Sequence, residues 1–182
     1  MRDPVFYRSR RHRRGRSRPP VILALSTFGL GLIGLTALDP PAPLIIYNAS
    51  ASAPLGFYRV LADPIRRGDL ALARTPDSVR RLASERGYLP EGVPLVKRVA
   101  ALDGDTVCAV GRAITIDGRA VAKQLAADYL GRPLPAWAGC RTLGPGQVFL
   151  LMEGVQDSFD SRYFGPVPTS AIIGKLVPLW AG

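Results

Sequence analysis

The chain has 182 residues and is 47% apolar, so it is long enough for one ordinary domain with an appendage. Its net charge of +10 arises mainly in residues 1–20, where eight Arg and one Asp leave +7. Residues 21–182 carry the remaining +3, so the body is not a broadly basic domain. His12, the sole histidine, lies in the basic tail, which excludes Ser-His and Cys-His catalysis and most zinc sites from the rest of the chain.

An uncharged apolar segment, Val21–Leu38, follows the basic tail. Its length is near the lower limit for crossing a hydrocarbon core of about 30 Å. The arginines on its N-terminal side predict a cytoplasmic tail (1–20), a membrane anchor (21–38) and an exported domain (39–182). A cleaved signal peptide is the competing interpretation, with Ala49–Ala51 as its cleavage motif. The tail is also of the kind that binds nucleic acid, but beside this segment we interpret it as a topology signal, and we expect membrane lipid rather than nucleic acid as a partner.

The exported part reads chiefly as strands after a stiff Pro-rich linker at residues 39–43. Hydrophobic patterns predict strands at 44–47, 56–62, 69–74, 94–102, 105–110, 147–152 and 171–176. A hairpin is predicted at 113–122, with Asp117-Gly118 as its turn. One helix is predicted at 76–86, with Thr75 as its cap and Gly87 at its end. Residues 123–145 read as irregular. The fold class is therefore mainly β with one short helix, preceded by a transmembrane helix.

Cys108 and Cys140 are the two cysteines of the chain. In a domain predicted to lie outside the cytoplasm, such a pair is typical of a disulfide. Closing the loop between them contributes roughly 3–4 kcal/mol in the chain-entropy model. Two unpaired buried thiols are the alternative interpretation.

Lys97 stands out because 21 of the 24 basic residues are Arg. It lies in the run Pro94–Leu102, which is apolar apart from Lys97 and Arg98. Arginine keeps its proton in proteins, whereas burial can lower the pKa of a lysine by several units. A lysine kept in this run therefore indicates a neutral amine that acts as a general base. The alternative is a strand lysine whose ammonium reaches water.

Four sequence blocks follow one another in a fixed order: Ser52-Ala-Pro54 with Gly56-x-Tyr58, Arg67-Gly-Asp69, Val96-Lys-Arg-Val99 with Gly104-Asp105, and Asp157-Ser-Phe-Asp-Ser-Arg-Tyr-Phe-Gly-Pro166. Over roughly residues 44–178, the chain resembles the type I signal peptidase family of Ser-Lys proteases. Within that family it is most similar to the TraF-type conjugal transfer peptidases.

The resemblance implies a nucleophile at Ser52 and a general base at Lys97. It also implies that Ser50 donates a hydrogen bond to the oxyanion, together with the backbone N–H of Ser52. Ser158 matches a serine that orients the lysine amine.

Asp160 and Arg162 match a supporting ion pair. Asp160 should not pair with Lys97, because an adjacent anion raises the pKa of a lysine. No metal or organic cofactor is implied.

The implied activity is that of a serine endopeptidase on the outer face of a bacterial inner membrane, acting on precursors with small residues before the cut. The TraF branch implies maturation of a conjugative pilin precursor, including the joining of its ends when an amine is the acceptor. A general signal peptidase is one alternative, although Ser52 and Pro54 are separated by Ala53 alone, Asp103 stands where leader peptidases commonly have Pro, and their Gly-Asp-Asn block is missing. A catalytically inactive scaffold of a transfer apparatus is another.

Overall fold

The computed structural model describes residues 19–38 and 42–181, and the chain divides into two compact units after Pro41. The first unit contains α1, Pro19–Leu38, over the segment predicted as the anchor. Prolines at its first two positions suit a helix start, where no intrahelical N–H donor is needed. Among residues whose side chains are described, no helix is both long and apolar enough to cross a bilayer. The basic tail (1–18) and linker residues 39–41 lie outside the described residues.

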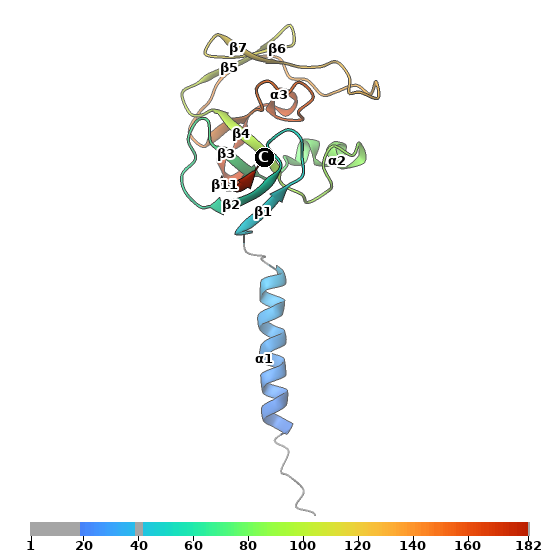
Figure 1. The fold of residues 1–182 in the computed structure, drawn as a ribbon, viewed down its shortest axis with the longest axis vertical. Coiled ribbons are helices and arrows are strands. Elements are labelled where there is room, and N and C mark those ends of the chain that lie inside the picture. Colours follow the sequence, from blue (N-terminus) through green and yellow to red (C-terminus); the bar gives the residue numbers. More distant parts are fainter. Residues whose placement is uncertain (1–18, 39–41, 182) are drawn as a thin grey trace, which may run out of the picture. The chain divides into compact units, whose positions relative to one another are not determined.

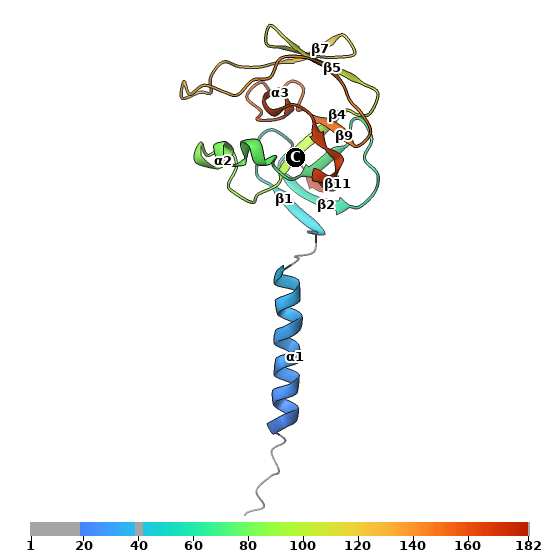
Figure 2. The ribbon, with the colours of Figure 1, turned by 180° about the vertical axis from the view of Figure 1, so that it is seen from behind.

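The second unit is built from two antiparallel sheets (Figures 1 and 2). The larger sheet has the strand order β1-β2-β11-β3-β4-β9-β10, and the smaller has the order β7-β6-β5-β8. The strands are β1 Ile45–Asn48, β2 Gly56–Leu61, β3 Leu70–Ala73, β4 Leu95–Ala101, β5 Thr106–Val110, β6 Ala113–Ile116, β7 Arg119–Lys123, β8 Gly139–Thr142, β9 Gln147–Leu150, β10 Val167–Pro168 and β11 Ile172–Ala181. The mainly β fold class predicted from the sequence is confirmed.

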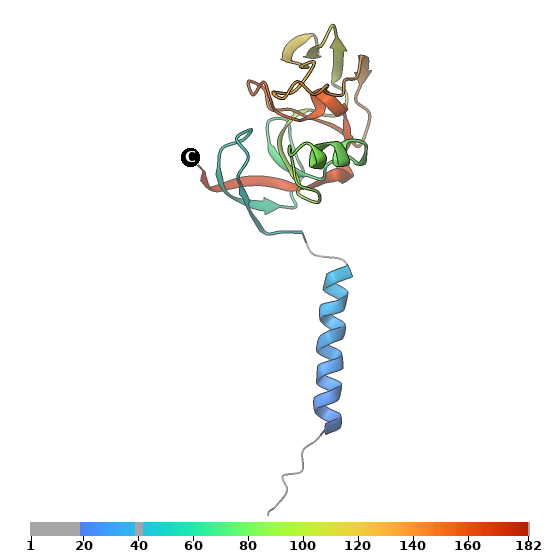
Figure 3. The same cartoon turned by 90° about the vertical axis from the view of Figure 1, so that its right-hand side faces the viewer.

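The C-terminal strand β11 lies between β2 and β3 (Figure 3). Lys175 is opposite Leu61 on one side and Ala71 on the other, and its Nζ pairs with Asp69 at 2.8 Å. The connection over residues 62–69 is longer than a tight hairpin loop, which leaves room for a third strand. β11 thereby joins β2 to β3, which in turn pairs with β4.

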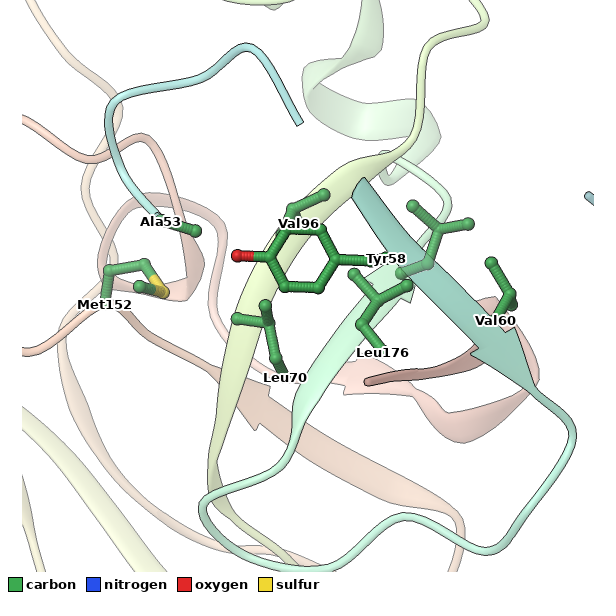
Figure 4. Close-up of a cluster of buried hydrophobic side chains, with 8 residues drawn as sticks. Ala53, Tyr58, Val60, Leu70, Val96, Met152 and Leu176 are labelled. Carbon is green, nitrogen blue, oxygen red and sulfur yellow. The ribbon is translucent and has the colours of Figure 1, made fainter. Parts of the chain in front are cut away.

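A cluster of buried hydrophobic side chains packs against the larger sheet (Figure 4). Tyr58 lies among the other side chains, with its hydroxyl directed toward Ala53. The buried members are Ala53, Tyr58, Val60, Leu70, Leu72, Val96, Met152 and Leu176. Because Ala53 belongs to the β1–β2 loop (residues 49–55), this cluster holds one end of that loop in the core.

The smaller sheet contains an element that the sequence analysis missed. β8 lies in the region read as irregular, and it pairs with β5 so that Cys140 is opposite Cys108. The two sulfurs are bonded at 2.04 Å. All four residues of β8 are exposed, so the strand lacks the alternation of apolar and polar residues that predicts strands.

The helix α2 spans Asp77–Glu85, within the predicted range, but its predicted cap is wrong. The helix begins one residue later than expected, so Pro76 occupies the cap position, and no side chain among residues 19–38 and 42–181 caps the helix. The Thr75 hydroxyl is buried and finds no hydrogen-bond partner within the described part of the chain. Asp77 in the first turn pairs with Arg80 and suits the positive end of the helix dipole. The short α3, Ser161–Phe164, and the 3-10 turn Thr169–Ala171 complete the unit.

Candidate active site

Ser52 is presented by the β1–β2 loop. The strand register ends at Asn48 opposite Gly56, and residues 49–55 bulge out between them. Ser52 is half-buried, whereas the next residue, Ala53, is packed into the core at 5% exposure. The N–H of Ala53 donates to the carbonyl of Ser50 at 3.3 Å, so the serine lies within a tight turn whose far end is anchored.

Lys97 reaches this serine from the middle of β4. It lies opposite Ala71 in β3 and is 4% exposed. Its Nζ is hydrogen-bonded to Ser52 Oγ at 2.8 Å and to Ser158 Oγ at 2.9 Å. The structure therefore brings together a serine and a lysine that are 45 residues apart in sequence.

Burial lowers the pKa of Lys97 from 10.5 to about 8. The negative charge of Asp160 opposes this shift, Arg162 adds to it, and Asp157 opposes it. Desolvation dominates because the ammonium loses its hydration without gaining an ion pair. At a pH near 8, about half of the Lys97 amines are thus neutral and able to accept a proton.

Ser50 lies beside Ser52 on the same loop. Their hydroxyl oxygens are 2.9 Å apart, and the backbone N–H of Ser52 donates to Ser50 Oγ at 3.3 Å. The two groups named as oxyanion donors therefore contact each other here. A substrate oxygen entering between them would take over the bond that the Ser52 N–H now makes.

Asp160 and Arg162 form a buried ion pair. Arg162 Nε and Nη2 donate to the two carboxylate oxygens of Asp160 at 2.8 and 3.0 Å. The N–H of Met152 donates to the same carboxylate at 3.1 Å. Among the residues that the structure describes, no carboxylate forms an ion pair with Lys97. Asp160 is thus saturated by other donors, as a neutral lysine requires.

A cleft of about 1100 Å³ opens over these groups. Ser50, Ser52, Lys97 and Ser158 line it, together with some residues of the segments 87–97 and 125–134. Its lining includes many apolar side chains, as is usual for a binding cleft with few polar groups at its reactive point. Among the described residues, no cluster of His, Cys, Asp or Glu side chains could hold a metal ion.

The sequence analysis missed a polar cluster at this cleft, of which Tyr88 and Asp128 are lining residues. Tyr88 donates its hydroxyl hydrogen to Asp128, and Arg132 Nε pairs with the same carboxylate at 2.6 Å. Burial raises the pKa of Asp128, but the hydrogen bonds from Tyr88 and Arg132 outweigh it and hold this pKa well below its usual range. The three residues join the segment after α2 to residues 125–134. No local pattern signals this contact, because Tyr88 and Asp128 are 40 residues apart.

Comparison with known proteins links the sequence to one family. The family described as signal peptidase, peptidase S26, matches residues 21–180. The probable conjugal transfer protein TraF of Sinorhizobium fredii is 34% identical, covering 96% of this chain and 95% of the relative. The conjugal transfer protein TraF of Agrobacterium fabrum is 37% identical, covering 90% and 97%. A signal peptidase I of Leptolyngbya laminosa is 28% identical, covering 63% and 52%.

Proposed function

Because the chain belongs to the signal peptidase family, peptidase S26, in the branch of the TraF conjugal transfer proteins, we propose that it is a membrane-anchored serine endopeptidase that processes a conjugative pilin precursor. The observation that carries the proposal is the hydrogen bond between a buried lysine of lowered pKa and a half-buried serine, Lys97 and Ser52, at 2.8 Å. Serine–lysine pairs are a known variant of the serine triad.

In the proposed reaction, neutral Lys97 accepts the hydroxyl proton of Ser52 as its oxygen attacks the scissile carbonyl. The lysine ammonium then gives this proton to the leaving amine, and an acyl-enzyme remains. Water attacks the ester with Lys97 again as base, which releases an acid and restores the serine. When a substrate amine takes the place of water, the same steps yield a new peptide bond.

Two groups are proposed to stabilise the oxyanion of the tetrahedral intermediate. The Ser52 N–H and the Ser50 O–H lie on one loop, next to the attacking oxygen. Removing one such donor typically lowers kcat by about 10²–10³-fold. Ser158 is proposed to orient the lysine amine, since its hydroxyl contacts Nζ at 2.9 Å without adding charge.

A row of exposed aromatic side chains supports an activity at a membrane surface. Tyr47, Phe57 and Trp180 are neighbours across β1, β2 and β11, and they are 54%, 47% and 70% exposed. Exposed apolar patches of this kind are typical of membrane or protein contacts. Together with the apolar segment of α1, the row supports a single-pass inner-membrane protein with its catalytic domain on the periplasmic face.

Replacing Ser52 by Ala tests the proposal. We expect Ser52→Ala to abolish cleavage of the pilin precursor encoded with the chain, as measured by product mass, while the thermal unfolding temperature stays within a few degrees. A cyclic product would weigh one water less than the linear one. Cleavage by Ser52→Ala at the wild-type rate would overturn the proposal and favour an inactive scaffold.

A general signal peptidase remains the second candidate because a signal peptidase I aligns with part of the chain. Competition separates the two functions. A secretory precursor with an ordinary signal peptide should be cleaved at least 10-fold more slowly than the pilin precursor under equal conditions. Equal rates for both would favour the general function.

A further inference from the structure

Asn48 is the one asparagine in the chain. Its side chain is hydrogen-bonded to the backbone of the β1–β2 loop. It is the last residue of β1 and is 4% exposed. Its Nδ2 lies 3.0, 3.1 and 3.0 Å from the backbone carbonyl oxygens of Ser50, Ala53 and Pro54, so its two hydrogens serve three acceptors and one of them is shared. Its Oδ1 accepts the N–H of Ser50 at 3.1 Å. An amide combines the donors and the acceptor that this arrangement needs.

These bonds are not needed to pair the strands. The backbone register of β1 and β2 already runs up to Asn48 opposite Gly56, so the sheet is complete without the side-chain amide. Within the described part of the chain, residues 49–55 have few other hydrogen bonds. These are the Ala53-to-Ser50 turn, the contacts of the Ser52 N–H and Oγ with Ser50 Oγ, the bond from Lys97 to Ser52, and the Tyr58 hydroxyl, which donates to the Pro54 carbonyl at 2.7 Å. The Asn48 amide therefore acts on the loop rather than on the sheet.

The contacts of Asn48 lie on both sides of Ser52. Ser50 is held at its N–H and its carbonyl, which fixes the residue whose hydroxyl contacts Ser52 Oγ. The carbonyls of Ala53 and Pro54 are held on the other side. The backbone of Ser52 is thus clamped between two fixed points, and its Oγ is presented to Lys97 at 2.8 Å.

We infer that Asn48 is the positioning residue that holds the nucleophile and its oxyanion N–H in reacting geometry, an inference that rests on the proposed function for its kinetic consequence. Asn48 does not touch the reacting atoms. It acts through the loop backbone, so its loss should lower kcat while leaving substrate affinity nearly unchanged. A misplacement near 1 Å of a reacting group typically costs about 10²-fold in rate.

The test uses the full-length chain in detergent with two variants, Asn48→Ala and Asn48→Asp. Asp matches Asn in size but directs a carboxylate oxygen, in place of the amide donors, at three carbonyl oxygens. With a quenched fluorescent peptide that carries Ala at the first and third positions before the cut, both variants should lose about 10²-fold in kcat, with KM within threefold of the wild type. If Asn48→Asp keeps the wild-type kcat, the side chain only fills space and the inference fails.

A second measurement does not depend on activity. Amide hydrogen exchange followed by NMR should be at least 10-fold faster at Ser50 and Ala53 in Asn48→Ala, while the amides within β1 and β2 keep their rates. Gln124→Glu is the matched control, because Gln124 is also a buried amide that bridges two backbone carbonyls, those of Trp137 and Arg162. It should leave exchange in the loop unchanged.

The outcomes separate the inference from the proposed function. Unchanged exchange at Ser50 and Ala53 in Asn48→Ala overturns the inference, whatever the activity. Undiminished cleavage by Ser52→Ala overturns the proposed function, and the exchange rates then still decide whether Asn48 holds the loop.

Discussion

At the scale of single residues, the proposed chemistry depends on the protonation of one amine. Lys97 is hydrogen-bonded to two hydroxyls and to no carboxylate among the described residues, so burial sets its pKa near 8. Two hydroxyl partners orient the nitrogen without stabilising its charged form as an anion would. The site therefore combines a fixed position with a proton affinity suited to mildly alkaline conditions.

This pKa predicts the pH dependence of activity. Lys97 works as a base only when neutral, so kcat/KM should rise with pH, about tenfold per unit well below pH 8, and level off above it. The measurement is cleavage of the fluorescent peptide between pH 6 and 10, with circular dichroism to verify folding at each pH. A profile that is flat from pH 6 to 8 would contradict the assignment.

We expect that removing the Arg162 charge lowers the free energy of unfolding more than removing any other single charge. Its guanidinium is 2% exposed and offsets the fully buried carboxylate of Asp160. Arg162→Ala should lower the free energy of unfolding by about 3–5 kcal/mol, because it leaves that carboxylate without its partner. Urea unfolding measures the loss. The double variant Asp160→Ala/Arg162→Ala should recover part of it, and no recovery would show that the cost is not electrostatic.

At the scale of elements, the site depends on how closely β2 and β11 approach. Gly56, the first residue of β2, has φ +147°, and a Cβ built there would lie 2.1 Å from the carbonyl oxygen of Trp180. No side chain fits that space unless the backbone moves. The same glycine lies opposite Asn48, so the close approach of β11 and the start of the loop depend on one position.

Gly56→Ala is therefore expected to destabilise the domain by about 2 kcal/mol or more, through backbone strain and the clash with β11. Gly118→Ala is the matched control. Gly118 also has a positive φ, +78°, but a Cβ added there would meet nothing within 4 Å, so it should lose only about 1–2 kcal/mol. Thermal unfolding compares the two, and equal losses would show that the contact with β11 does not matter.

At the scale of the whole molecule, the disulfide and the groups proposed to react lie in different sheets. Ser52 and Lys97 belong to the larger sheet and its loop, whereas the disulfide of Cys108 and Cys140 joins β5 to β8 in the smaller one. A domain of this size gains stability from such a bond through the restriction of its unfolded chain.

Removing the disulfide should therefore affect folding more than catalysis. The double variant Cys108→Ser/Cys140→Ser is expected to lose about 2–4 kcal/mol of unfolding free energy, while kcat per folded molecule stays within twofold. Urea unfolding and active-enzyme titration measure the two effects. A loss of kcat without a loss of stability would show that the smaller sheet takes part in the reaction.

The sequence by itself determined the local features of this protein. Alternating apolar residues indicated most of the strands, α2 was found within one residue at each end, and the rarity of lysine drew attention to Lys97. These signals are readable because each depends on residues close together in the chain. The ordered motif blocks added the family and the roles expected of Ser52 and Ser158.

Only the tertiary structure decided how distant segments meet. The insertion of β11 between β2 and β3, the pairing of exposed β8, and the contact of Tyr88 with Asp128 leave no local pattern. The role of Asn48 was hidden for a related reason: its four bonds go to backbone groups, which every residue type carries. Long-range register and side-chain-to-backbone bonds are set by packing, so they appear only once the chain is folded.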